Sequence, residues 1–293
     1  MDIASVFTVR RDDVSSITSF LLKLGAVVML YGPPGTGKSS VKRDVEQQLS
    51  REVFSIQCNE STEAQEVMAT ALPWEGRWTV VLGQIIRAMQ AGGIVWFDDF
   101  HAAGAGLHSA FRLAADMGKG MEFLLPNPTG EKIVPKPGYG VVCTTNGAWR
   151  VEDGLAPEIA DRIRHPIPVY TPSTIMLDAL LPEFRVICQR DYESAALRGE
   201  DPKTTYREYE SMTKVVNAGA SIDQALLWTI GPERGAKLLT GLATKLHHAG
   251  AIAAVDRLSK GLNSGAPGSQ GSVSDAAQAA NTIPPVGGDD GPF

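Results

Sequence analysis

Residues 32–39 read Gly32-Pro33-Pro34-Gly35-Thr36-Gly37-Lys38-Ser39, a full match to the phosphate-loop pattern G-x-x-x-x-G-K-[ST]. An apolar, strand-like stretch (26–31) precedes the loop, and a stretch with helical spacing (39–49) follows it. In this setting the glycines let backbone N–H groups turn around a phosphate at the positive end of the helix. We therefore predict that residues 32–39 and Ser40 bind phosphate, with Lys38 at the β/γ oxygens and the Ser39 hydroxyl on Mg²⁺. The alternative is a Gly/Pro loop with an incidental lysine.

A second signal is the apolar stretch 94–97, which ends in Asp98-Asp99. The carboxyl ends of parallel strands are where catalytic groups gather in such folds. We predict that Asp98 holds Mg²⁺ through water and that Asp99 polarises the attacking water. The alternative role for this pair is to cap the next helix.

A third strand-like stretch, 141–145, leads to Asn146. This amide is predicted to hydrogen-bond the attacking water or the γ-phosphate, and the alternative is an ordinary Asn that starts the Asn146-Gly147 turn. Guanine recognition would be expected to bring an Asn-Lys-x-Asp segment, and the sequence has none. The predicted nucleotide is therefore ATP.

Strand and helix signals alternate along the first half of the chain. Strands are predicted at 26–31, 53–58, 94–97, 141–145 and 167–170, and helices at 39–49, 83–89 and 107–117. This alternation predicts an α/β fold in which helices cover a parallel sheet. Residues 74–83 and 121–134 are predicted hairpin inserts outside that sheet. In the first insert, Trp74 and Trp78 either contact a substrate or pack the hairpin onto the sheet.

The predicted domain organisation has three parts. Residues 1–171 form the nucleotide-binding α/β domain, and 172–262 form a helical lid domain with helices at 173–181, 206–218, 222–230 and 233–246. The last segment, 263–293, has six Gly and four Pro among small polar residues. Such a composition cannot bury enough surface to offset its ordering entropy, so a disordered tail is predicted.

Composition restricts the class of protein. The 293 residues are 43% hydrophobic and 20% charged, as in ordinary globular proteins. No apolar run approaches the ~18–20 residues needed to cross a bilayer, and the N-terminus lacks a secretory pattern. The three cysteines have no Cys-x-x-Cys spacing, so a reducing cytoplasm is the expected location. A net charge of −6 disfavours non-specific nucleic-acid binding over the whole surface.

The order of these parts resembles the AAA+ ATPases over roughly residues 15–170. It is similar, more narrowly, to the MoxR, CbbQ/NirQ and CobS-like (dynein-related AAA_5) group. Two segments carry this narrower resemblance: residues 83–93, and the stretch that runs from 123–126 to 144–146. The resemblance implies a P-loop AAA+ core with a C-terminal helical lid and assembly into a homohexameric ring.

The resemblance also implies two arginine roles. Residues 155–163 fit the segment whose arginine reaches a neighbouring subunit's γ-phosphate, which places Arg162 as this finger, with Arg164 or a plain surface ion pair as alternatives. Residues 231–235 resemble the sensor-2 motif, so that Arg234 would touch the phosphates from the lid. A solvent-facing arginine at a helix start is the alternative for Arg234.

The chain departs from the family pattern at one catalytic position. Most relatives end the acidic strand with Asp-Glu, whereas this chain has Asp98-Asp99, one methylene shorter where water is polarised. Since ~1 Å of misplacement can cost ~10² in rate, hydrolysis is expected to be slow.

Three functions remain open. The first is a remodelling or chelatase-type motor that acts on a protein client with a von Willebrand A-domain or chelatase-subunit partner. The second is a nucleic-acid motor or loader, and the third is a slow-turnover assembly switch. The hairpin inserts and the deficit of basic residues favour the first.

Overall fold

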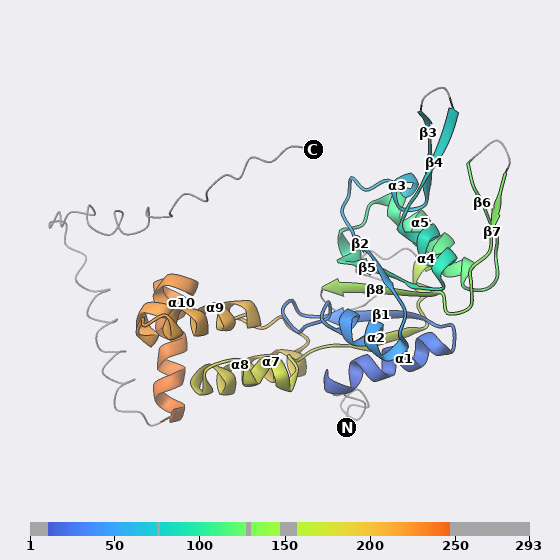
Figure 1. Cartoon of the computed structure of the whole chain (residues 1–293). Helices are drawn as coiled ribbons and strands as arrows, with labels where there is room; N and C mark the ends of the chain where they lie inside the picture. Colours follow the sequence, from blue (N-terminus) through green and yellow to red (C-terminus); the bar gives the residue numbers. More distant parts are fainter. Residues whose placement is uncertain (1–10, 75–76, 127–129, 147–156, 247–293) are drawn as a thin grey trace, which may run out of the picture.

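The computed structural model describes residues 11–74, 77–126, 130–146 and 157–246 (Figure 1). Its centre is a five-stranded sheet in the order β2-β5-β8-β1-β9, in which all neighbouring strands are parallel. The strands are β1 (Val27–Gly32), β2 (Val53–Gln57), β5 (Ile94–Asp98), β8 (Gly140–Asn146) and β9 (His165–Pro168). The predicted parallel α/β sheet is therefore confirmed, strand by strand.

Helices cover both faces of this sheet, and the side chains of β5 show how. Ile94 and Trp96 point to the face covered by α1 (Val14–Lys23) and α2 (Val41–Leu49). Val95 and Phe97 point to the opposite face, covered by α3 (Ala64–Val67), α4 (Gln84–Ala91) and α5 (Ala105–Met117). A strand buried on both sides reads as a continuous apolar run, which is why the sequence revealed it. Short helical turns are η2 (Arg11–Asp13), η3 (Phe100–Ala102) and α6 (Pro157–Ala160).

Two antiparallel hairpins extend from one end of this domain (Figure 1). One pairs β3 (Ala69–Trp74) with β4 (Arg77–Leu82), and the other pairs β6 (Phe123–Leu124) with β7 (Lys132–Ile133). The predicted start of the first hairpin at 74 is wrong, because pairing begins at Ala69. Its first strand, Ala-Thr-Ala-Leu-Pro-Trp, has a low intrinsic strand preference, and the hydrogen bonds to β4 stabilise it as a strand.

The C-terminal part of the described chain is helical, with its own buried cluster of apolar side chains. Its helices are α7 (Thr174–Asp178), α8 (Pro182–Arg198), α9 (Tyr206–Asn217) and α10 (Ile222–Leu246). Gly231, at φ 80° and ψ 168°, interrupts α10, so the two helices predicted at 222–230 and 233–246 correspond to its two halves. Sequence reading missed α8, whose buried residues from Phe184 to Ala195 are interspersed with charged ones.

Within the described residues, no helix is both long enough and apolar enough to cross a bilayer. The predicted tail, 263–293, and the end of the predicted lid, 247–262, lie outside the described residues.

Candidate functional site

The phosphate loop joins β1 to α2, and its backbone conformation requires glycine. Gly35 and Gly37 have φ of +78° and +82°, values that L side chains rarely adopt. A Cβ on Gly32 would lie 2.3 Å from the Val169 carbonyl oxygen, and one on Gly37 would lie 2.7 Å from the sulfur of Met176. The loop is thus shaped by its own glycines and packed closely against its neighbours.

Lys38 folds over this loop. Its Nζ donates hydrogen bonds of 2.8 Å to the carbonyl oxygens of Gly32 and Pro33. Burial lowers the pKa of Lys38 to about 8; attraction to Asp99 and Asp201 opposes this shift, and repulsion from Arg207 adds to it. A polyphosphate bound at the loop would restore the charged form, because anionic oxygens replace neutral carbonyls.

The two residues predicted to hold magnesium lie together. Ser39 Oγ donates to Asp98 Oδ1 at 3.2 Å, and Thr144 Oγ1 donates to the same oxygen at 2.7 Å. Hydroxyl and carboxylate oxygens are the hard ligands that Mg²⁺ prefers, and Mg²⁺ keeps several waters besides. The donor set therefore fits a magnesium ion, which Ser39 of the loop and Asp98 at the end of β5 would hold.

Asp99 has different partners from Asp98. Gln57 Nε2 donates to its Oδ2 at 3.1 Å, and Asn146 Nδ2 donates to its Oδ1 at 3.2 Å. The Asp99 side chain makes no capping hydrogen bond to η3, the turn that follows it. The carboxylate is thus held by two amides and is not engaged as a cap.

The backbone of Asp99 offers a reason for the shorter side chain at this position. Its φ of 54° and ψ of 47° lie in the left-handed region, where Asp and Asn are several-fold enriched over other non-glycine residues. The backbone N–H of Asp99 donates to Thr144 Oγ1 at 3.1 Å, which fixes the turn. An Asp is therefore better suited to this backbone than the Glu of the resembling family.

Strand register explains why these residues meet. Gln57 is paired with Asp98 across β2 and β5, and Gly32 is paired with Asn146 across β1 and β8. Sequence reading identified Asp98, Asp99 and Asn146 as strand ends, but it missed Gln57 and Thr144. A signal existed for Gln57, because it lies next to the end of the predicted strand 53–58, at the same edge of the sheet.

Arg11 is a third residue of the site that the sequence analysis missed. Its guanidinium donates to the carbonyl oxygens of Thr36 at 3.0 Å and Gly37 at 2.8 Å, and to Ser40 Oγ at 3.0 Å. Burial lowers the pKa of this arginine, although nearby carboxylates, Asp44 first, raise it. No motif marks Arg11, since it lies 25 residues before the nearest of these partners.

A cavity of about 680 Å³ adjoins the loop on this side. Its lining comes from η2, α2 and the start of the helical part, where Asp12 accepts hydrogen bonds from the backbone N–H and the hydroxyl of Thr174. Its lining includes Arg11, Ser39, Ser40, Lys42, Ile175 and Met176. Polar and charged groups from η2, the loop and α2 make up most of the lining, and α7 adds the apolar Ile175 and Met176.

Arg162 lies outside the carboxylate cluster and is paired within its own chain. Its Nε and Nη2 donate to the two oxygens of Asp116 at 3.0 and 2.7 Å, and its Nη1 donates to the Glu158 carbonyl oxygen at 2.6 Å. The hydrogen bond from Arg162 lowers the pKa of Asp116. Arg164, the alternative finger, is exposed. The role of either arginine toward a neighbouring nucleotide stays a prediction.

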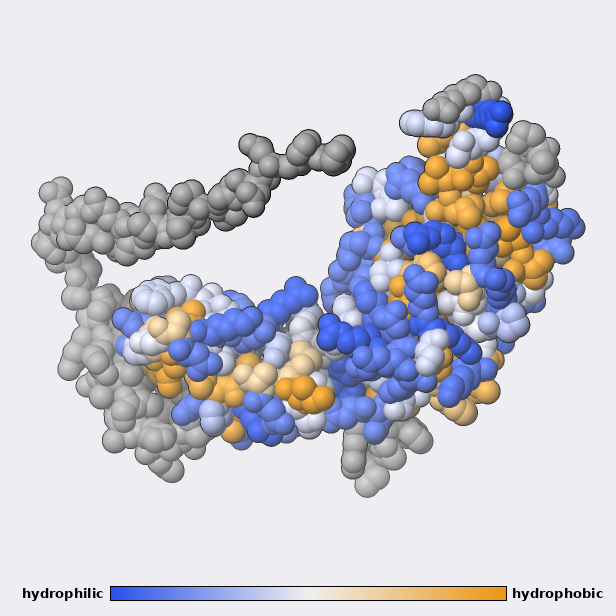
Figure 2. Space-filling model, in the orientation of Figure 1, coloured by the Kyte–Doolittle hydropathy of each residue, from blue (hydrophilic) through white to orange (hydrophobic). Residues whose placement is uncertain are grey.

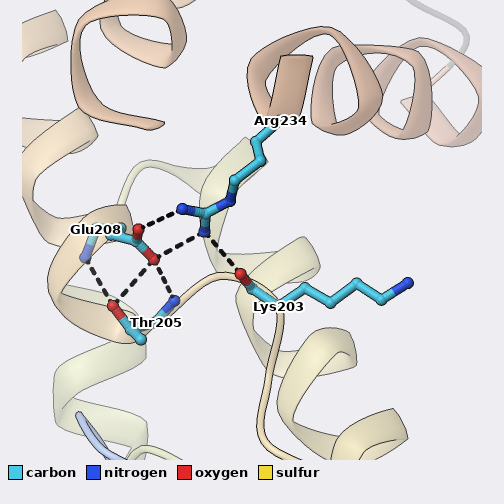
Figure 3. Close-up of polar contacts among 4 residues, drawn as sticks. All are labelled: Lys203, Thr205, Glu208 and Arg234. Atoms are coloured by element: carbon cyan, nitrogen blue, oxygen red, sulfur yellow. Dashed lines mark hydrogen bonds and ion pairs between the residues drawn. The ribbon is translucent and has the colours of Figure 1, made fainter. Parts of the chain in front are cut away.

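Arg234 is also engaged within the helical part (Figure 3). Its Nη1 donates to Glu208 Oε1 at 2.9 Å, and its Nη2 donates to the Lys203 carbonyl oxygen at 2.6 Å. Glu208 in turn accepts from the backbone N–H of Thr205, and the two residues form the capping box of α9. The predicted phosphate contact of Arg234 stays a prediction, and in this structure the side chain supports the start of α9.

A helix-covered parallel sheet with a phosphate loop on β1 and an acidic end on β5 is the architecture of a P-loop AAA+ core. Residues 27–116 match the family described as AAA domain (dynein-related subfamily). The matched segment runs from β1 into α5 and includes the phosphate loop and both aspartates.

The chain is also similar to uncharacterized bacterial proteins. Identity to the protein YojN of Bacillus subtilis is 27% over 133 residues, 44% of this chain and 42% of YojN, so the match spans less than half of that relative. Uncharacterized proteins of Staphylococcus saprophyticus and Staphylococcus haemolyticus are each 22% identical, over 76% and 74% of this chain and 86% and 84% of their own lengths. A crystal structure of a Cytophaga hutchinsonii protein described as a candidate ATPase aligns with a TM-score of 0.44 and 13% identity, covering 75% of this chain and 63% of that one.

Proposed function

We propose that this protein is a magnesium-dependent ATPase of the AAA+ type that works as a homo-oligomeric, hexameric ring. The main observation behind the proposed ATPase activity is that the two carboxylates beside the phosphate loop have different hydrogen-bond partners. Asp98 is shared by Ser39 and Thr144, whereas Asp99 is held by Gln57 and Asn146. The match of residues 27–116 to the AAA domain supports the same conclusion.

Each residue then has a role in hydrolysis. The loop N–H groups and Lys38 bind the β- and γ-phosphates. Ser39 and Asp98 would hold the magnesium ion, which would supply positive charge at the phosphate oxygens. Asp99 accepts a hydrogen bond from a water molecule and orients it for attack on the γ-phosphorus. As the water oxygen bonds to phosphorus, the bond to the ADP oxygen breaks and the water proton passes through Asp99 to phosphate or solvent. The amides of Gln57 and Asn146 hold the carboxylate in place.

The cavity beside the loop suits the nucleoside. Its lining is mostly polar and charged, which suits the hydroxyls of a ribose, and Ile175 and Met176 are its apolar residues. A base held there would contact η2, α2 and α7 together, so that nucleotide binding would tie the sheet domain to the helical part. This placement supports a role for the nucleotide in setting the relative position of the two parts.

Ring assembly gives Arg162 or Arg164 an anionic partner. In the single chain, Asp116 neutralises Arg162 through two hydrogen bonds, so acting on a neighbour's γ-phosphate would require Arg162 to exchange one anion for another. Arg164 is exposed and needs no such exchange. An arginine supplied in trans contributes ~10³–10⁵ in rate in known NTPases.

A protein client, as in MoxR- and CobS-like motors, fits the surface of the hairpins. Trp74 and Trp78 are 68% and 63% exposed, so they do not pack the hairpin onto the sheet. Leu72, Val81 and Leu124 are exposed on the same pair of hairpins, and Figure 2 shows apolar side chains gathered at this end of the molecule. Apolar, aromatic surface favours protein over phosphate backbone as the ligand, and a von Willebrand A-domain or chelatase-subunit partner remains part of this proposal.

Two measurements test the proposal. Purified protein is expected to release phosphate from MgATP, and Lys38→Ala should abolish nucleotide binding while circular dichroism stays unchanged, since Lys38 bonds only the loop's own carbonyls among the described residues. Light scattering should show a ring with a non-hydrolysable ATP analogue and Mg²⁺. Unchanged affinity in Lys38→Ala would refute the site assignment, and a monomer under all conditions would refute the ring.

The slow-turnover switch is the second candidate, and the shorter carboxylate of Asp99 favours it. In that case ATP would drive assembly without appreciable phosphate release. The same two measurements separate the candidates, because a switch assembles with ATP but shows no turnover above that of Asp99→Asn.

A further inference from the structure

Arg11 binds the phosphate loop through the carbonyl groups of the loop. Its Nε donates to the Thr36 carbonyl oxygen at 3.0 Å, and its Nη2 donates to the Gly37 carbonyl oxygen at 2.8 Å. The same Nη2 also donates to Ser40 Oγ at 3.0 Å, and Arg11 is only 7% exposed. Because a guanidinium is a rigid, planar fork, a buried one that bonds two consecutive carbonyl groups fixes the orientation of both peptide planes.

The orientation of these two carbonyl groups also sets the direction of the N–H groups in the same peptide bonds. The peptide bonds that follow Thr36 and Gly37 are trans, and in a trans peptide bond the C=O and N–H groups point in opposite directions. The N–H groups of Gly37 and Lys38 therefore point away from Arg11. Since Gly37 is conformationally permissive, a contact from outside the loop is needed to hold these peptide planes in one orientation.

The N–H groups of Gly37 and Lys38 are available to a ligand. Among the residues that the structure describes, neither of them donates a hydrogen bond to a protein atom. Backbone donors without a protein acceptor require water or a ligand in its place. Successive N–H groups in a glycine-rich loop before a helix form a concave anion-binding surface, so a phosphate is the acceptor that suits them.

The turn that carries Arg11 is held by two neighbouring elements. Asp12 accepts hydrogen bonds from the backbone N–H and the hydroxyl of Thr174, the first residue of α7. In α1, which follows the turn, Ser15 Oγ donates to Asp44 Oδ2 of α2 at 2.9 Å. The position of Arg11 is therefore set by contacts outside the loop that it binds.

We propose that Arg11 is a positioning residue for nucleotide binding, which orients the N–H groups of Gly37 and Lys38 toward the phosphates of the nucleotide. This inference rests on the proposed nucleotide-binding function and adds to it a residue that acts through the loop backbone. Without the guanidinium, the two peptide planes are free to rotate. Phosphate binding must then also order the loop, and this ordering lowers the affinity.

The first measurement is a calorimetric titration of the full-length protein with a non-hydrolysable ATP analogue and Mg²⁺. Arg11→Lys keeps the positive charge and removes the fork that bonds both carbonyl groups, so it should weaken binding about tenfold or more. Arg11→Gln, which also removes the charge, should weaken binding at least as much. If Arg11→Gln does not fold, Arg11→Lys decides alone. An affinity of Arg11→Lys equal to that of the wild type would overturn the inference, because charge alone would then be sufficient.

The second measurement reports on the two N–H groups directly. Hydrogen bonds from N–H groups to phosphate are short and strong, and they move the amide proton resonance downfield. In the wild type, the amide protons of Gly37 and Lys38 should move downfield when the analogue is added. In Arg11→Lys saturated with the analogue, this shift should be much smaller. A shift equal to that of the wild type would also overturn the inference, because any loss of affinity would then come from a contact between Arg11 and the nucleoside.

Arg51→Lys is the matched control. Arg51 is also partly buried and also donates to a backbone carbonyl oxygen, that of Gly138 at 2.9 Å, but this contact lies before β2 and β8, at the opposite edge of the sheet. The substitution should change the affinity by less than about twofold, even where it lowers the melting temperature as Arg11→Lys does. Equal weakening by both substitutions would overturn the inference, because a general loss of stability would then explain both.

The proposed function fails in a different way. If the wild-type protein binds no nucleotide, or if Lys38→Ala binds as well as the wild type, the phosphate site itself is refuted and this inference with it. If the wild type binds and Lys38→Ala does not, the affinity and the amide shifts of Arg11→Lys decide the inference.

Discussion

Replacing Asp99 with Asn separates a catalytic role from a structural one. The change removes the negative charge and keeps the size of the side chain. The backbone tolerates it, because Asn, like Asp, is favoured at the left-handed φ of 54°. One oxygen still accepts from Gln57 or Asn146, and rotation of the Gln57 amide lets its oxygen accept from the new NH₂ group.

The expected cost in stability is therefore small. One amide contact at a partly exposed site is exchanged for another, so the free energy of unfolding should change by less than about 1 kcal/mol. For a chain of this size, that corresponds to a shift of no more than about 2–4 °C in melting temperature. ATP affinity and assembly should be retained, since Asp99 is assigned to water and Asp98 to magnesium.

The expected cost in turnover is large. Loss of the charge that polarises the water should lower kcat more than tenfold, or more than about 1.4 kcal/mol of transition-state stabilisation. The assay is steady-state phosphate release at saturating MgATP, with analogue binding and light scattering as controls. A kcat equal to that of the wild type, with binding and assembly intact, would refute the assignment of Asp99 to the attacking water.

Three further changes test other contacts. Tyr192→Phe removes a buried hydroxyl that is hydrogen-bonded to the Pro34 carbonyl oxygen and to the Tyr206 backbone N–H. The free energy of unfolding should fall by about 2 kcal/mol and the melting temperature by about 4–8 °C. An unchanged melting curve would contradict this expectation. Burial lowers the pKa of Lys38 to about 8, so its side chain is charged below pH 8 and neutral above it. ATP affinity should therefore fall about tenfold from pH 7.5 to 9. An ATP affinity that does not change with pH in calorimetry would contradict the assignment of Lys38 to phosphate. Asp116→Asn should remove the ion pair that holds Arg162 and shift ATP-dependent assembly to lower protein concentration in light scattering. Unchanged assembly would show that Arg162 takes no part in the interface between subunits.

Most of the sheet could be predicted, because its strands are buried on both faces and read as apolar runs such as 94–97. Boundaries were less predictable where pairing overrides propensity, as at Ala69. The helix α8 was missed because its buried positions are interspersed with charged residues that face solvent.

The sequence alone determined the phosphate loop and the strand-end carboxylates. These are contiguous patterns whose conformation is set locally, by glycines that adopt positive φ and by apolar strands that end in Asp. A local pattern can be read without knowing what lies across the fold.

Only the tertiary structure decided which partners complete the site. Arg11 reaches the loop from 25 residues before Thr36, and Tyr192 reaches it from 158 residues after Pro34. Arg162 meets Asp116 across 46 residues, so its charge is matched within the chain before any neighbour is considered. Such contacts depend on how the helical part and the N-terminal turn pack against the sheet, and packing between distant segments leaves no periodicity or motif in either of them.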